Sequence, residues 1–186
     1  MDISVCIKEV PDVDAPFSVR DGELAFDTDR VVLNAYDASA VEAALVLTEE
    51  HGGEVEVVTV GPPDVTETIR KALAMGADRA VHLTTDEPEA YDARAYADVL
   101  AGYYGDSDAD AIFCGKQSQD TDAGLTGPML AALLDRPYAA NVVGIDREAD
   151  GLVVERQGDA GSEIIALDAP CLVTCSNDMN NPRIPK

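Results

Sequence analysis

Residues 111–128 read AIFCGKQSQDTDAGLTGP, and this stretch decides the fold. Its first four residues are apolar and predict the end of a buried strand, Gly115 allows a turn, and Asp120 or Thr121 can cap the helix that follows. A strand, a polar loop and a helix in this order are typical of an α/β protein that holds a phosphate, because the free amides and the dipole of a helix start favour an anion. Lys116 adds a positive charge to the loop. The loop has neither the Walker spacing nor a G-x-G-x-x-G motif, so it does not by itself identify a family.

Strands and helices alternate around this loop. The predicted strands are 3–10, 55–60, 80–83 and 111–114, and the predicted helices are 37–51, 62–75, 92–104 and 121–134. Strand–helix–strand connections are right-handed, so we predict an α/β fold with a doubly wound, mostly parallel, Rossmann-like sheet. From residue 142 onward, apolar runs are separated by turns at Asp150-Gly151 and Ala160-Gly161. These runs predict a C-terminal β-hairpin extension of the sheet.

The composition predicts one acidic, folded domain over residues 1–186. With 46% apolar residues the chain can build a substantial core, and no Pro/Gly/Ser-rich linker divides it. Acidic residues number 36 against 13 basic ones, which gives a formal net charge of −23. Nucleic acid and anionic membranes are poor partners for such a surface. The carboxylate excess suits a cytoplasm at molar salt, where the Debye length falls to about 3 Å, so we expect a halophilic protein that loses compactness at low ionic strength.

The chain shows no targeting or membrane-spanning pattern. A strand begins at residue 3 without a basic and then apolar leader, and no apolar run reaches the about 18 residues that a membrane span needs. We therefore expect a soluble, cytoplasmic protein that is not inserted in a membrane. The cysteines Cys6, Cys114, Cys171 and Cys175 lie mostly at apolar strand positions, which favours buried thiols. With only two histidines, neither a metal site nor a Cys-His nucleophile is expected.

Candidate site residues follow the predicted strands, since the ligands of an open α/β sheet bind at the carboxyl ends of its strands. These positions are residues 8–12, 61–62 and 115–126, together with residues 34–37 before the first helix. Asn34 can contact a ligand there, whereas capping of the helix is the favoured role of Asp37. None of these residues supplies an obvious nucleophile or general base. The sequence thus predicts binding or carrying rather than bond-breaking catalysis, with no catalytic residue.

Several motifs, in this order along the chain, resemble the electron-transfer flavoprotein β subunit. They are VCIKEVPD at 5–12, NAYDASAVEAAL at 34–45, VGPP at 60–63, KALAMGADRA at 71–80, the loop after residue 114, and NNPR at 180–183. The resemblance covers essentially the whole chain. It implies an adenine-nucleotide α-hydrolase-like fold and a heterodimer with an α subunit that carries most of the FAD. It further implies that the β subunit binds AMP, that electrons arrive from acyl-CoA or other dehydrogenases, and that they leave to a membrane quinone oxidoreductase.

The resemblance also assigns residues to the AMP site. The family's contacts fall on Cys6, Asn34, Ala35, Tyr36, Asp37, Val60, Gly115, Lys116, Gln117, Ser118, Gln119, Asp120, Thr121, Asp122, Ala123, Gly124, Leu125 and Thr126. The phosphate is then expected at the amides of residues 119–123. Met179 falls where the family places the side chain that docks partner dehydrogenases, although it can equally pack on its own domain.

Two alternatives to this function remain open. The first is a bifurcating β subunit that binds a second FAD in place of AMP; Thr126 and Ala123 favour the AMP type. The second is an adenine-nucleotide-binding stress or sensor module without a redox partner. Relatives usually continue into a C-terminal arm that wraps the α subunit, whereas this sequence stops at Lys186, so the arm is either truncated or absent. Ala35 replaces a proline that many relatives have.

Overall fold

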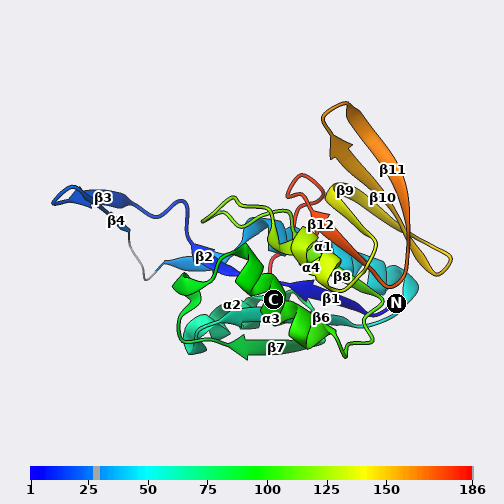
Figure 1. Cartoon of the computed structure of the whole chain (residues 1–186), viewed down its shortest axis with the longest axis horizontal. Helices are drawn as coiled ribbons and strands as arrows, with labels where there is room; N and C mark the ends of the chain where they lie inside the picture. The colour runs from blue at the N-terminus through cyan, green and yellow to red at the C-terminus, as the bar shows by residue number, and fades with distance from the viewer. Residues whose placement is uncertain (27–29, 186) are drawn as a thin grey trace.

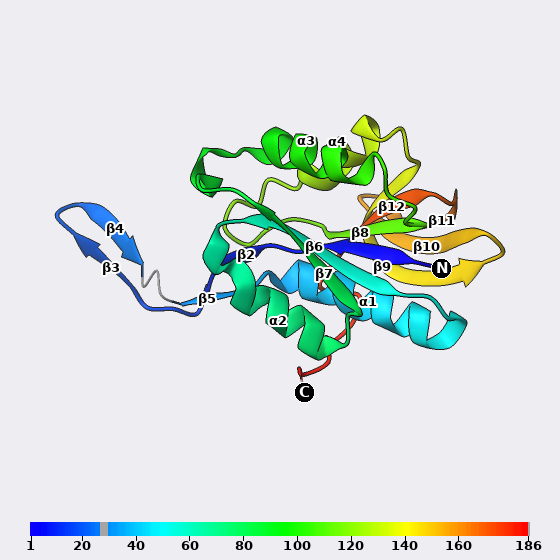
Figure 2. The ribbon, with the colours of Figure 1, turned by 90° about the horizontal axis from the view of Figure 1, so that it is seen from below.

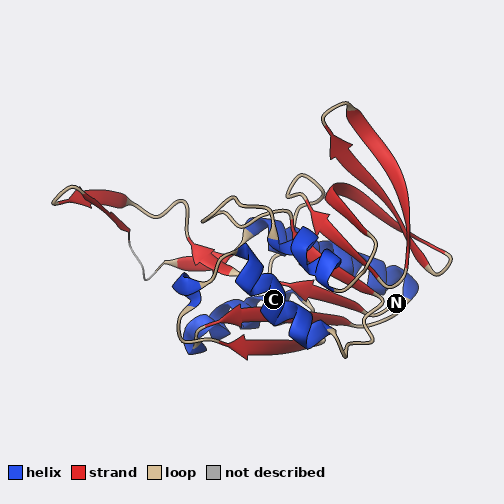
Figure 3. Ribbon diagram, in the orientation of Figure 1, coloured by secondary structure: helices blue, strands red, loops and turns tan. Residues whose placement is uncertain are grey.

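The computed structural model describes residues 1–26 and 30–185. Its central sheet has eight strands in the order β11-β10-β9-β12-β8-β1-β6-β7 (Figures 1 and 3). Five of them run parallel to their sheet neighbours from β12 to β7: β12 (Cys171–Cys175), β8 (Ala111–Gly115), β1 (Ile3–Cys6), β6 (Val55–Gly61) and β7 (Arg79–Thr84). The α/β class and the doubly wound, mostly parallel sheet are therefore confirmed.

The C-terminal extension is antiparallel at its outer edge. Strand β9 (Tyr138–Glu148) pairs with β10 (Gly151–Gly158), which pairs with β11 (Gly161–Asp168). The last strand, β12, does not continue these hairpins. It returns between β8 and β9 and runs parallel to both. All five of its residues are buried, as expected for an interior strand covered on both faces.

Four α-helices cover the two faces of the sheet (Figure 2). Helices α1 (Ala35–His51) and α2 (Thr66–Met75) lie on one face, and α3 (Ala93–Tyr104) and α4 (Thr126–Leu133) lie on the other. Short 3₁₀ turns, η1 (Pro63–Val65) and η2 (Pro88–Ala90), precede α2 and α3. Among the described residues, no helix has both the length and the apolar character that crossing a bilayer requires.

Side chains alternate between the two faces, which gives two apolar cores. Ile3 and Val5 of β1 join the core under α1, whereas Cys6 of the same strand packs against the core under α3 and α4. On β8, Phe113 likewise belongs to the first core and Cys114 to the second. This alternation decides which side chains can reach a ligand on the α3 side of the sheet.

Several predicted boundaries were wrong. The expected strand 3–10 is two strands, because the chain leaves the sheet after Cys6 and forms β2 (Glu9–Pro11), which pairs antiparallel with β5 (Val31–Leu33). Helix α1 begins two residues earlier than expected, so Asp37 lies within its first turn and does not cap it. Helix α3 is nearly as predicted, and Asp92 is its N-cap, accepting a 2.8 Å hydrogen bond from the amide of Ala95.

A hairpin that we did not predict stands away from the sheet. It consists of β3 (Phe17–Arg20) and β4 (Glu23–Phe26), with Asp21 and Gly22 at its tip (Figures 1 and 2). Both tip residues have positive φ, 54° and 85°. An Asp-Gly pair between two short strands is a strong hairpin signal, so the sequence contained the information needed to predict this hairpin.

Candidate functional site

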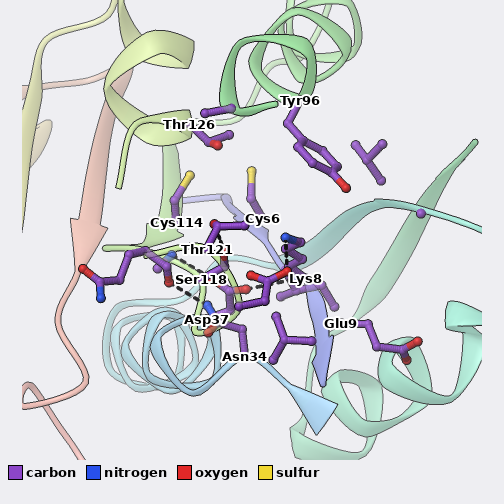
Figure 4. Close-up of a pocket in the computed structure, with 18 of the residues that line it drawn as sticks. Cys6, Lys8, Glu9, Asn34, Asp37, Tyr96, Cys114, Ser118, Thr121 and Thr126 are labelled. Atoms are coloured by element: carbon purple, nitrogen blue, oxygen red, sulfur yellow. Dashed lines mark hydrogen bonds and ion pairs between the residues drawn. The ribbon is translucent and has the colours of Figure 1, made fainter. Parts of the chain in front are cut away.

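A cavity of about 630 Å³ opens at the carboxyl ends of β1, β6 and β8 (Figure 4). This is the edge of the sheet at which a ligand was expected. Of the site residues predicted from the sequence, those that line it are Cys6, Asn34, Asp37, Val60, Gly115, Lys116, Gln117, Ser118, Asp120, Thr121, Ala123, Gly124, Leu125 and Thr126. Ala35, Tyr36, Gln119 and Asp122 do not line it. These lining residues come from four segments that are distant in sequence, and all four reach the same cavity.

Asp37 accepts hydrogen bonds from the backbone at the ends of both β1 and β8. One of its carboxylate oxygens accepts a hydrogen bond from the amide of Lys8 at 2.8 Å, and the other accepts one from the amide of Gly115 at 3.0 Å. Burial raises the pKa of Asp37 to about 7, although hydrogen bonds from Asn34, Lys8 and Gly115 act in the opposite direction. Asp37 therefore shapes the cavity from within α1 instead of capping that helix.

The approach of α1 to β8 requires a glycine at position 115. A Cβ atom there would lie 2.7 Å from Cβ of Tyr36 and 2.9 Å from the amide nitrogen of Asp37, and it would also meet the Asp37 carboxylate. Only a residue without a side chain lets the strand end and the helix start come this close. The sequence predicted that Gly115 allows a turn, whereas the structure requires glycine there because α1 approaches the strand end.

Asn34 holds the polar loop that follows β8. Its side chain is fully buried, donates to the carbonyl of Gln117 at 2.8 Å and accepts from the amide of Gln119 at 3.2 Å. The side chain of Gln119 in turn accepts a hydrogen bond from the amide of Ala35 at 3.1 Å. These bonds join the start of α1 to the loop, which explains why Gln119 and Ala35 brace the cavity wall without lining it.

The helix after this loop starts later than we predicted. Residues 119–121 form a turn, and α4 begins only at Thr126. Asp122 and Gly124 have positive φ, 53° and 63°, which interrupts any helix between 121 and 125. The prediction that Asp120 or Thr121 caps the helix was therefore wrong. The Asp122 carboxylate instead accepts a 2.7 Å hydrogen bond from the side chain of Gln117.

Lys8 lines the cavity and contacts two of its other lining residues. Its ammonium group pairs with Asp120 at 2.6 Å and lies 5.4 Å from the ring centre of Tyr96 on α3. Burial raises the pKa of Asp120, but hydrogen bonds from Lys8 and Ser118 and the charge of Lys8 bring it below its ordinary value. The pairing accounts for a carboxylate beside an expected phosphate site, because Lys8 offsets its charge.

Sequence reasoning missed the wall of the cavity that α3 supplies. Tyr96 and Leu100 of α3 line it together with Tyr91, which lies just before that helix, and the rings of Tyr91 and Tyr96 meet edge to face with their centres 5.4 Å apart. Together with Val60 they make an apolar surface opposite the polar loop. The only available signal was the position of α3 directly after a strand of the sheet, since no motif marks these tyrosines.

The cavity thus combines an apolar wall with a polar loop and two lysines, Lys8 and Lys116, and its lining also includes the acidic residues Glu9, Asp37, Asp92 and Asp120. Such a combination suits a ligand with a flat ring at one end and an anion at the other. Among the described residues, no group of three or more histidine, cysteine or acidic side chains is arranged to hold a metal ion. Met179, outside the cavity, is half-buried and packs against the core under α1.

Comparison with known proteins identifies the family. The model of the electron transfer flavoprotein domain matches residues 23–186. The chain is 36% identical to "Electron transfer flavoprotein subunit beta" of Thermoanaerobacterium thermosaccharolyticum, over 100% of this chain and 72% of the relative. It is also 36% identical to "Acryloyl-CoA reductase electron transfer subunit gamma" of Anaerotignum propionicum (96% and 68%) and 38% identical to "Protein FixA" of Azorhizobium caulinodans (98% and 68%).

The chain belongs to the electron transfer flavoprotein family. The resemblance seen in the motifs is confirmed, and this electron transfer flavoprotein subunit is of the β type. Members of the family carry electrons and are not enzymes that break bonds, which agrees with the binding or carrying role expected from the site residues. FAD use by the assembled complex follows from the family.

Proposed function

We propose that this chain binds AMP in the cavity at the ends of β1, β6 and β8, as the β subunit of an electron-transfer flavoprotein heterodimer. The observation that carries the proposal is the composition of that cavity, which joins an apolar wall to a polar loop bearing Lys116. Adenine fits between the apolar side chains, and the phosphate fits against the loop. The AMP holds the loop, α1 and α3 together, while the FAD carried mainly by the α subunit exchanges the electrons.

The expected electron path has a donor and an acceptor outside the chain. We infer that acyl-CoA or other dehydrogenases reduce the flavin and that a membrane quinone oxidoreductase accepts the electrons. A relative named as an electron transfer subunit of acryloyl-CoA reductase supports a donor or acceptor that acts on CoA thioesters. The docking of a dehydrogenase at Met179 is part of this proposal. The half-buried position of Met179 leaves part of its side chain on the surface for such a contact.

A second FAD in place of AMP is the competing proposal. The cavity volume of about 630 Å³ supports this proposal, because sites of this volume also hold ligands larger than AMP. Thr126 and Ala123, the two residues whose identity favours AMP over a second FAD, both line the cavity. The third reading, a sensor module without a redox partner, has no support in the names of the relatives, which are electron-transfer subunits.

Calorimetric titration of the full chain with AMP in molar salt tests the proposal. Lys116→Ala should weaken binding about 10- to 100-fold, because a hydrogen bond to a charged group contributes about 1.5–3 kcal/mol. Lys71→Ala is the matched control, since Lys71 lies on α2 outside the cavity lining and its loss should leave the affinity unchanged. Absence of AMP binding, or equal weakening by both variants, would contradict the proposal.

A further inference from the structure

Two of the four cysteines share one wall of the cavity. Cys6 on β1 and Cys114 on β8 are direct partners in the parallel register of these strands, which lie about 4.8 Å apart in any sheet. Both line the cavity, and Figure 4 shows both sulfur atoms pointing to the same side, towards Thr126 and Tyr96. Cys171 and Cys175 belong to the core under α1, on the opposite face of the sheet. The sheet thus separates the thiols into two pairs, and only one pair faces the cavity.

A chain of buried polar groups holds the sulfur of Cys6 in place. The hydroxyl of Tyr104 lies 3.4 Å from this sulfur and 2.9 Å from the hydroxyl of Ser4, which donates to the Glu56 carboxylate at 3.0 Å. Tyr104 is only 1% exposed, so its hydroxyl cannot turn to water. Cys6 is half-buried and lines the cavity.

The Cys114 thiol is not expected to react by itself. Hydrogen bonding with Cys6 and burial raise the pKa of the Cys114 thiol well above its ordinary value, so this thiol is protonated at neutral pH. A protonated, buried thiol is a poor nucleophile and oxidises slowly. A centre that binds both sulfur atoms and releases both protons avoids this barrier, because ligation itself deprotonates a thiol.

We propose that Cys6 and Cys114 form a dithiol site that captures a soft, thiophilic centre, with a monosubstituted trivalent arsenical as the matching ligand class. In the capture step two As–S bonds form and the As–O bond of the arsenoxide breaks. The oxygen leaves as water with the two thiol protons, and arsenic stays trivalent, so no oxidant or reductant is needed. The bound group occupies the cavity under Tyr96 and Thr126 and excludes a nucleotide. This last consequence, unlike the site itself, rests on the proposed function.

Phenylarsine oxide and the full, reduced chain in molar salt test the site. We expect one arsenical per chain in the intact mass, and two of the four thiols should become unreactive toward a thiol reagent in denaturant. The adduct should survive about 1 mM of a monothiol and be removed by a dithiol, because the second sulfur acts at an effective concentration of at least about a millimolar. Cys6→Ser and Cys114→Ala should each retain less than one tenth of the adduct under the same wash.

Cys171→Ser is the matched control, since it removes a buried thiol from the other face of the sheet and should retain the full adduct. Circular dichroism establishes that each variant is folded. An adduct that persists in folded Cys6→Ser, or that is lost in folded Cys171→Ser, would overturn the site, as would the absence of any adduct in the unmodified chain. AMP should slow adduct formation. An adduct that depends on Cys6 and Cys114 but is unaffected by AMP would support the dithiol site and contradict the proposed nucleotide function.

Discussion

Replacement of Gly115 by alanine should destabilise the fold and the cavity together. The new Cβ would lie 2.7 Å from Cβ of Tyr36 and 2.9 Å from the amide nitrogen of Asp37, and these atoms are fixed in the first turn of α1. Overpacking of this kind costs about 1–3 kcal/mol. Above about pH 7, where Asp37 is ionised, the displaced side chain would also lose its 3.0 Å hydrogen bond from the amide of residue 115, which is worth about 1.5–3 kcal/mol for a charged acceptor. We expect a total loss of about 2.5–6 kcal/mol.

Urea unfolding in molar salt, followed by circular dichroism, measures this loss. Gly102→Ala is the matched control, because Gly102 lies in α3 and a Cβ there meets no atom within 4 Å. Alanine favours a helix over glycine, so this variant should gain up to about 1 kcal/mol. If Gly115→Ala unfolds with a free energy within about 0.5 kcal/mol of the wild type, a change typical of neutral surface substitutions, the close contact between α1 and β8 is not as described.

Four further predictions concern titration, the C-terminal segment, salt and docking. Burial raises the pKa of Asp37 to about 7, whereas an unfolded aspartate titrates near about 3.9, so the folded chain keeps a proton that the unfolded chain has released. Between about pH 4 and pH 7, the free energy of unfolding should therefore fall with rising pH more steeply in the wild type than in Asp37→Asn, and equal slopes in urea unfolding would refute this. Arg183 pairs with Glu42 at 2.9 Å and also with Glu49, so Arg183→Ala should speed hydrogen exchange of residues 179–185, while protection equal to the wild type would show that these pairs do not hold the segment. With a net charge of −23, the thermal midpoint should drop from molar to millimolar salt, and a constant midpoint in circular dichroism would count against adaptation to salt. Met179→Ala should slow reduction by a partner dehydrogenase without changing the nucleotide content, and unchanged stopped-flow kinetics would remove Met179 from the docking surface.

Local patterns in the sequence were sufficient to predict most of the parallel sheet and its helices. The strand at Ala111–Gly115 and the helix at Ala93–Tyr104 lie within one residue of their predicted bounds, because an apolar run and an Asp cap define them locally. The start of α4 was wrong by five residues, because Asp122 and Gly124 adopt positive φ in a loop that the side chain of Asn34 binds at Gln117 and Gln119. Such a conformation depends on contacts between distant segments.

The candidate site could be predicted only in part, because local patterns mark where its segments lie but not how they contact one another. The ends of the predicted strands indicated the loop after β8, the start of the first predicted helix indicated residues 34–37, and most of these residues line the cavity. The roles of individual residues depend on long-range contacts that no local pattern reveals. Asp37 joins β1 to β8, and Lys8 reaches Asp120, which is more than a hundred residues away. Strand β12 likewise lies between β8 and β9, where its whole length is buried, and not beside β11, which precedes it in the sequence.

The central claim is that the cavity at the ends of β1, β6 and β8 holds AMP in a flavoprotein heterodimer. The most direct test is to purify the native complex with its α subunit in molar salt and to identify the released nucleotides by mass spectrometry and absorbance. We predict one FAD and one AMP per heterodimer. Two FAD per heterodimer, or FAD without any second adenine nucleotide, would contradict the claim.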